Sequence, residues 1–225
     1  SQIACVGNPR NDVLFEKKSP AKKFAEFSKF KKIILWLPTF RKQATSSRVD
    51  SHYDFPLGLP IIYDAESLTK INSYLKERNM LILFKLHPAQ DTSCLKADNL
   101  SNIQIISDDL LFKKGVELRE LFKITDAMIT DYSSIFYDYY QTGKIVGFTM
   151  DDFEEYKNTK GFAYENPLEL MCGNHIFNMD DLYTFIDDVL KNNDKYKKER
   201  KKVNNLVNKY NDKNSSKRLA EFLGL

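Results

Sequence analysis

Apolar residues occur in two patterns along the chain. Short continuous runs bounded by charge or proline are typical of strands buried on both faces of a parallel sheet. Longer stretches in which apolar residues return every three or four positions are typical of helices with one buried face. The strand-like runs fall at residues 2–6, 32–37, 80–86, 103–106, 127–129 and 145–148. The helical patterns fall at 20–30, 65–78, 116–125, 151–157 and about 180–225, and a further helix begins after residue 134.

Strands and helices alternate along most of the chain. This order predicts an α/β fold, a Rossmann-like parallel sheet with helices on both faces. Residues 42–60 contain Ser, Thr, Asp, Gly and two prolines with little periodicity, which predicts a long loop. Because there is no internal repeat and no low-complexity linker, we interpret residues 1–225 as a single domain with C-terminal helices from about 180 onward.

The composition is that of a soluble globular protein, with 42% hydrophobic and 29% charged residues among 225. The longest apolar runs are strand-sized and too short to span a membrane. The three cysteines, Cys5, Cys94 and Cys172, are widely spaced and include no CxxC pair, so we interpret them as free thiols of a cytosolic protein. The N-terminus has no secretory signal pattern and begins almost inside a predicted strand, so we expect the natural sequence to extend upstream.

Positive charge is concentrated near the C-terminus. Residues 191–225 hold 11 Lys and Arg against 4 Asp and Glu, a net +7, and the rest of the chain carries −4. A basic helix can contact nucleic acid or an anionic membrane surface, although a solvated helix face is the more usual explanation. No aromatic residues are interleaved as base stacking would need, so we expect no nucleic-acid partner.

Polar residues follow three of the predicted strands, at 38–41, 87–88 and 130–134. Because the carboxyl ends of parallel strands lie at one edge of the sheet, these segments can converge. Arg41 offers two parallel N–H donors to phosphate oxygens, and His87 an imidazole that can transfer a proton or bind phosphate. Ser133 and Ser134 precede a helix whose first N–H groups suit phosphate.

The other two histidines have no such context. A lone histidine before proline is more often structural than catalytic, but the position of His87 beside two phosphate-suited turns favours a functional role. His52 and His175 fall in segments without periodicity, and we interpret them as surface residues.

Several motifs resemble, in order, the C-terminal half of the CDP-glycerol glycerophosphotransferase family, whose members build teichoic acid and related capsule polymers. They are GNPRND at 7–12, LPTFR at 37–41, LHP at 86–88 and ITDYSS at 129–134, followed by Asp138. Together they cover about residues 5–165. The resemblance implies a GT-B architecture, in which two Rossmann-like domains face a cleft. This chain would be the nucleotide-donor domain, with the acceptor-side domain upstream.

The resemblance also implies the site residues. It places His87 at the pyrophosphate of the donor as an essential residue, and Ser133 and Ser134 at the phosphate. Asp131 heads the same motif; because like charges repel, we expect it to cap the turn or contact a glycerol hydroxyl. The other implied donor-binding residues are Thr39, Tyr132, Arg10 and Arg41, with Arg41 nearer the donor than Arg10.

The sequence departs from the family pattern at two places. Lys160-Gly161-Phe162 stands where the family usually has Arg-Gly-Phe, and the change loses the two-pronged guanidinium. Residues 168–174 replace a Pro-Gly-Pro turn. These departures leave open whether the transferred group is glycerol phosphate, ribitol phosphate or another polyol phosphate.

The implied reaction transfers a polyol phosphate from a CDP-activated donor to a hydroxyl of a growing, lipid-linked surface polymer and releases CMP. The resemblance implies a cytoplasmic location at the inner face of the bacterial membrane. No cofactor or metal site is predicted, although Mg²⁺ can accompany the pyrophosphate. If the general base lies upstream, this chain should bind the donor without releasing CMP.

Two other functions share these features. A GT-B glycosyltransferase or sugar-nucleotide epimerase would use a UDP-sugar on the same kind of sheet. The identity of the donor therefore distinguishes it from a polyol-phosphate transferase. A non-catalytic nucleotide- or polymer-binding module would keep polymer synthesis in the whole protein after replacement of His87.

Overall fold

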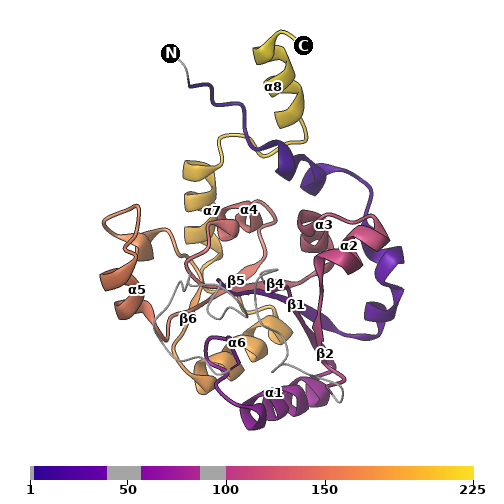
Figure 1. Ribbon diagram of the computed structural model, residues 1–225, viewed down its shortest axis with the longest axis vertical. Coiled ribbons are helices and arrows are strands. Elements are labelled where there is room, and N and C mark those ends of the chain that lie inside the picture. The colour runs from indigo at the N-terminus through magenta and orange to yellow at the C-terminus, as the bar shows by residue number, and fades with distance from the viewer. Residues whose placement is uncertain (1–2, 40–56, 87–99) are drawn as a thin grey trace.

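The computed structural model describes residues 3–39, 57–86 and 100–225 (Figure 1). Their strands form one sheet in the order β3-β2-β1-β4-β5-β6, and every neighbouring pair is parallel. The predicted α/β fold with a Rossmann-like parallel sheet is confirmed. The strands are β1 (Lys32–Leu37), β2 (Met80–Phe84), β3 (Ile103–Ile105), β4 (Ala127–Thr130), β5 (Ile145–Thr149) and β6 (Asn174–Ile176).

Helices cover both faces of the sheet, with α1 and α6 on one face and α2, α3 and α4 on the other (Figure 1). The α-helices are α1 (Ala65–Arg78), α2 (Asp108–Lys114), α3 (Leu118–Ile124), α4 (Ile135–Tyr140), α5 (Phe153–Thr159), α6 (Met179–Lys191), α7 (Lys197–Val207) and α8 (Ser215–Leu223). Among the described residues, the 3₁₀ helices are η1 (Pro9–Phe15), η2 (Pro20–Lys29) and η4 (Pro167–Glu169). In the described part of the chain, no helix is both long enough and apolar enough to cross a membrane.

The alternation of side chains along β1 shows how the core is divided. Ile34 and Trp36 pack beneath α1 and α6, whereas Ile33, Leu35 and Leu37 face the other layer, and all five are buried. A strand that is covered on both faces needs apolar residues at every position. This explains why the continuous run at 32–37 predicts the central strand correctly.

Several local predictions were wrong. Residues 3–6 form no strand and run instead beside α8, where Arg218 Nε donates to the Val6 carbonyl at 2.9 Å (Figure 1). The helix predicted at 20–30 is present as η2, with Phe24 and Phe27 buried, but it is a 3₁₀ helix with a kink at Phe24. Helix α2 and strand β6 were not predicted, and His175 lies in β6, where its Nε2 is 3.1 Å from the Met171 carbonyl oxygen. His175 is therefore part of a short edge strand, not of an irregular segment. Of the predicted loop at 42–60, only residues 57–60 are described.

Asp12 fixes α8 to the start of the chain. Its carboxylate accepts the N–H groups of Ser215 and Ser216 at 2.9 and 2.8 Å, the first free donors of that helix. Burial alone would raise the pKa of Asp12, but these hydrogen bonds outweigh it and lower the pKa below its usual value. Gly7 allows the close approach, because its φ is +89° and a Cβ there would lie 2.5 Å from Ser215 Oγ.

The strand order identifies where a ligand is expected. The chain builds outward from β1 to β3 on one side, then returns and continues from β4 to β6 on the other. In open α/β sheets, ligands bind outside the carboxyl ends of the strands at the point where the order reverses. Here that point lies between β1 and β4.

Candidate functional site

Two of the predicted motifs meet at the reversal point. Leu37 at the end of β1 is paired in register with Thr130 at the end of β4, so both strands leave the sheet side by side. Asp131 follows β4 and is fully buried. Its Oδ2 accepts the Thr39 backbone N–H at 2.7 Å and the Thr39 hydroxyl at 2.9 Å. The motifs at 37–41 and 129–134, remote in sequence, are thus joined by a side chain.

The contacts of Asp131 are those of a capping residue. A carboxylate that accepts a backbone N–H and a hydroxyl forms charge-assisted hydrogen bonds, which are stronger than neutral ones. Thr130 adds a second tie, since its hydroxyl donates to the Leu37 carbonyl at 2.7 Å. Asp131 therefore sets the course of the backbone as it leaves β1.

Ser133 and Ser134 form the turn between β4 and α4. Ser134 is the N-cap residue of α4, but its hydroxyl makes no capping hydrogen bond. Among the described residues, neither serine hydroxyl has a hydrogen-bond partner, and Ser134 is exposed. Both hydroxyls are therefore free to donate to a ligand at this edge of the sheet. Because α4 has only six residues, hydroxyl and N–H groups matter more here than a helix dipole.

Tyr132, in the same turn, contacts Asp152 and α5. Its hydroxyl donates to Asp152 Oδ1 at 2.8 Å. Its ring packs against Tyr156 and Phe162, with centroid separations of 4.2 and 5.5 Å. These contacts attach the turn to α5, so the turn is held from two directions, by Asp131 toward β1 and by Tyr132 toward α5.

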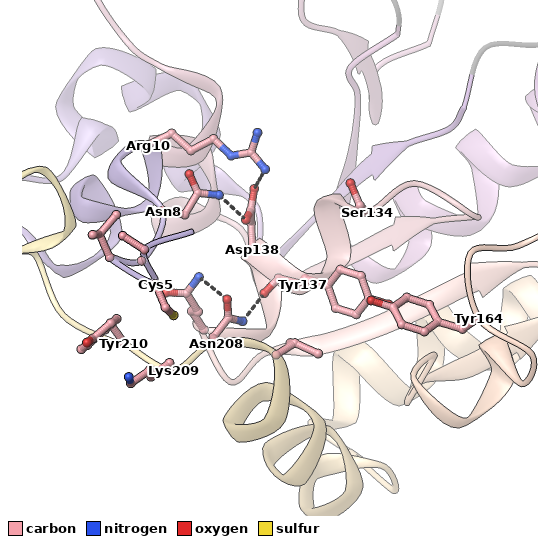
Figure 2. A pocket seen from close by; sticks show the side chains of 15 residues that line it. Cys5, Asn8, Arg10, Ser134, Tyr137, Asp138, Tyr164, Asn208, Lys209 and Tyr210 are labelled. Atoms are coloured by element: carbon pink, nitrogen blue, oxygen red, sulfur yellow. Dashed lines mark hydrogen bonds and ion pairs between the residues drawn. The ribbon is translucent and has the colours of Figure 1, made fainter. Parts of the chain in front are cut away.

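A cavity of about 470 Å³ opens beside the turn, along α4. Arg10 and Ser134 both line it, although they lie far apart in sequence (Figure 2). The Arg10 side chain is half exposed, and its Nη2 lies 3.1 Å from Asp138 Oδ2.

Arg119 was not predicted as a site residue. It lies in the short helix α3 and binds the same Asp138 carboxylate as Arg10. A lone arginine in a short helix gives no sequence signal of such a partner.

The segment after β5 also reaches this edge of the sheet. Asp151 Oδ2 accepts the Ile61 N–H at 2.8 Å and the Tyr63 hydroxyl at 2.7 Å. Ile61 has a φ of 68°, a left-handed conformation that is costly for a β-branched residue. Asp151 thus secures a strained segment next to the site, which the sequence did not indicate.

The end of β2 runs beside β1, because the Lys85 N–H donates to the Trp36 carbonyl at 3.0 Å. The Lys85 ammonium is buried and lies 3.0 Å from Asp108 Oδ1. Leu86 is the last residue described there; His87 and Arg41 lie outside the described residues. Within the described ranges, no three His, Cys, Asp or Glu side chains are grouped so as to hold a metal ion.

The fold and this edge define an α/β domain with a serine-containing polar turn at the reversal of its strand order. A family model described as CDP-Glycerol:Poly(glycerophosphate) glycerophosphotransferase matches residues 1–224. The chain belongs to this family, as the motifs indicated.

Curated relatives include enzymes for two different polyols. The chain is 31% identical to the teichoic acid ribitol-phosphate polymerase TarL of Staphylococcus aureus, over 98% of the chain and 37% of that protein. It is 30% identical to the teichoic acid poly(glycerol phosphate) polymerase of Bacillus spizizenii, over 71% of the chain and 38% of that protein. The chain thus spans well under two thirds of the length of these relatives.

Solved structures share the fold. The wall teichoic acid polymerase TagF superposes with a TM-score of 0.70 at 22% identity, over 99% of this chain and 52% of that one. A UDP-N-acetylglucosamine 2-epimerase from Listeria monocytogenes gives a TM-score of 0.52 at 16% identity, over 98% of this chain and 54% of that one. At these identities, the likeness extends to the fold alone.

We predict that Asp131→Ala lowers the free energy of unfolding by about 1–3 kcal/mol, because it leaves the Thr39 N–H without its buried acceptor. Thr39→Val should cost about 1 kcal/mol, since it removes the hydroxyl bond to Asp131 and keeps the backbone N–H bond. Urea unfolding monitored by circular dichroism measures both. Thr69→Val is the control: its exposed hydroxyl bonds within α1, and the change should stay within about 0.5 kcal/mol. If the losses in unfolding free energy of Asp131→Ala and Thr39→Val add fully in the double variant, the two residues are not directly coupled, which would contradict this account.

Proposed function

We propose that this chain is the single nucleotide-donor domain, residues 1–225, of an enzyme that transfers a polyol phosphate from a CDP-activated donor. The acceptor is a hydroxyl of a growing, lipid-linked teichoic-acid-like or capsular polymer, and CMP is released. One observation carries the proposal: in a member of this family, the Asp131–Thr39 bond brings two family motifs together at the strand reversal, where nucleotides bind in such sheets. Relatives at 31% and 30% identity use ribitol phosphate and glycerol phosphate by name, so the donor is assigned as a class, CDP-polyol.

The transfer is a displacement at phosphorus. The acceptor oxygen attacks the β-phosphorus, the bond from that phosphorus to the bridging oxygen breaks, and CMP departs with the bridging oxygen. Such a reaction needs positioning and charge neutralisation more than covalent help from the protein. The proposed ligands of the donor phosphates are Ser133, Ser134, Arg41 and Arg10, with Thr39 and Tyr132 completing the pocket. Asp131 shapes the site without touching phosphate.

His87 has one of two proposed roles. As an imidazolium it would stabilise the charge on the departing phosphate, and as a neutral imidazole it would take the proton from the acceptor hydroxyl. Side chains and N–H groups can provide the neutralisation without a metal, while Mg²⁺ can accompany the pyrophosphate.

We predict that the chain binds CDP-glycerol or CDP-ribitol in preference to UDP-N-acetylglucosamine, as measured by isothermal titration calorimetry. His87→Ala and Ser133→Ala should each weaken this binding at least about tenfold, a loss of about 1.4 kcal/mol. Repeating the titrations with EDTA and with Mg²⁺ tests the role of the metal.

Matched controls are His175→Gln in the edge strand β6 and Ser28→Ala on the exposed surface of η2, where the hydroxyl bonds only the Ala25 carbonyl. Both should bind the donor as tightly as the parent chain. Selective binding of a UDP-sugar would instead favour a glycosyltransferase or epimerase, with which the fold is shared. If His87→Ala and Ser133→Ala both bind a CDP-polyol as tightly as the parent chain, the assignment of the donor site to these residues is wrong.

We also propose peripheral contact with the inner face of the bacterial membrane. In α7, the exposed Lys201 and Lys202 lie three and four residues after the exposed Lys198, and the exposed Leu206 lies four after Lys202, so these side chains share one face. Arg200 and Val203 are buried on the other face. An exposed basic face that ends in an apolar side chain suits anionic lipid headgroups.

We predict that the chain cosediments with vesicles containing phosphatidylglycerol. Most of this binding should be lost in the triple variant in which Gln replaces Lys198, Lys201 and Lys202. The screened attraction of each lysine, about 1 kcal/mol near an anionic surface, is the reason. The control removes the same charge from exposed lysines elsewhere: Lys17, Lys18 and Lys22 to Gln. Equal losses in both variants would show that net charge, and not the α7 face, is responsible.

A further inference from the structure

Asp138 is a buried carboxylate at which three elements meet. It lies in α4 with its side chain only 5% exposed. Its Oδ2 is 3.1 Å from Arg10 Nη2 and 2.8 Å from Arg119 Nη2, while Asn11 Nδ2 donates to its Oδ1 at 2.8 Å (Figure 2 shows the Arg10 contact). Arg10 and Asn11 belong to η1, and Arg119 to α3. One carboxylate thus joins α4 to two other elements.

The charges in this cluster do not cancel. Two guanidinium groups face one carboxylate, so the cluster carries a net positive charge. Arg119 is mostly buried and approaches Asp138 through both Nε and Nη2, at 3.3 and 2.8 Å. Arg10 is half exposed and uses Nη2, and the Asn8 amide oxygen accepts its Nε at 3.0 Å in the orientation that satisfies both ends of that amide. Among the described residues, Arg10 Nη1 has no partner. The excess charge therefore resides on Arg10.

The cavity beside Arg10 is suited to an anion. Its volume is about 470 Å³, and the residues that line it include Ser134, whose hydroxyl is free, and the exposed Lys209. Asp138 also lies in the wall, but its charge is already compensated by Arg119. A guanidinium with donors to spare and a free hydroxyl form the kind of site that binds the oxygens of a phosphate group.

We propose that Asp138 is a positioning residue that holds Arg10 toward this cavity, and that Arg10 and Ser134 form a subsite there for a phosphate group. The inference rests on the proposed function and deepens it. The phosphate comes from the CDP-activated donor or from a phosphodiester of the polymer, two sources with the same chemistry. Without Asp138, the Arg10 side chain keeps its charge but loses the contact that directs it.

The test is a double-mutant cycle on ligand affinity. Calorimetry compares the parent chain, Arg10→Met, Asp138→Asn and the double variant, with CDP-glycerol, a short glycerol-phosphate oligomer and inorganic phosphate as separate probes. We expect Asp138→Asn to weaken binding of at least one probe about tenfold, and the double variant to bind no more weakly than Arg10→Met, because Asp138 acts through Arg10. A loss confined to CDP-glycerol assigns the subsite to the donor, and a loss confined to the oligomer assigns it to the polymer.

A merely structural role predicts a different pattern. Asp138→Asn would then lower the melting temperature without changing affinity, or its effect on affinity would add fully to that of Arg10→Met; either result overturns the inference. Asp187→Asn is the matched control, since Asp187 pairs with Arg78 at 2.7 Å between α6 and α1 on the other face of the sheet. It should leave the affinity for every probe unchanged.

If Asp138→Asn does not fold, Asp138→Glu replaces it. This variant keeps the charge and displaces the carboxylate by one methylene, so affinity should fall while the fold is retained; unchanged affinity in a folded Asp138→Glu chain overturns the inference. If the parent chain binds no CDP-polyol, the proposed function fails, and the inorganic phosphate probe still tests the subsite by itself.

Discussion

The hydrogen bonds from Thr39 to the buried Asp131 carboxylate are the interaction on which the candidate site depends. Parallel pairing brings the ends of β1 and β4 together, but it does not fix what the chain does after leaving the sheet. The Asp131 carboxylate, which lies between the ends of the two strands, fixes the chain there by binding Thr39. Because its partners include a backbone N–H, the Asp131 side chain directs the backbone that leaves β1, together with the Thr130 hydroxyl on the Leu37 carbonyl.

Around the Asp131–Thr39 bonds, further hydrogen bonds and ion pairs connect the site to neighbouring elements. Tyr132 attaches the turn to Asp152, Asp151 secures the strained Ile61, and Asp138 gathers the arginines of η1 and α3. Acidic residues thus occupy the supporting positions, while the free hydroxyls of Ser133 and Ser134 and the half-exposed Arg10 face outward. This division fits an anionic ligand, since carboxylates in direct contact with phosphate would repel it.

The sheet could be predicted from the sequence because strands buried on both faces, such as 32–37, must be apolar throughout. Strand β6 could not, since Asn174 and His175 are polar and only half buried at the sheet edge. The turn at 130–134 was found through its N-cap residues and its resemblance to a family motif. The grouping of Arg10, Arg119 and Asp138 could not be predicted from any local sequence pattern, because Arg10 and Asp138 lie 128 positions apart in the sequence.

A crystal structure of the chain with CDP-glycerol tests the central claim most directly. The account predicts that the diphosphate lies at the carboxyl edge between β1 and β4, with phosphate oxygens within hydrogen-bond distance of Ser133 or Ser134 and with the Asp131–Thr39 bonds intact. A donor bound on another face, or one whose phosphates lie away from the turn at 131–134, would contradict it.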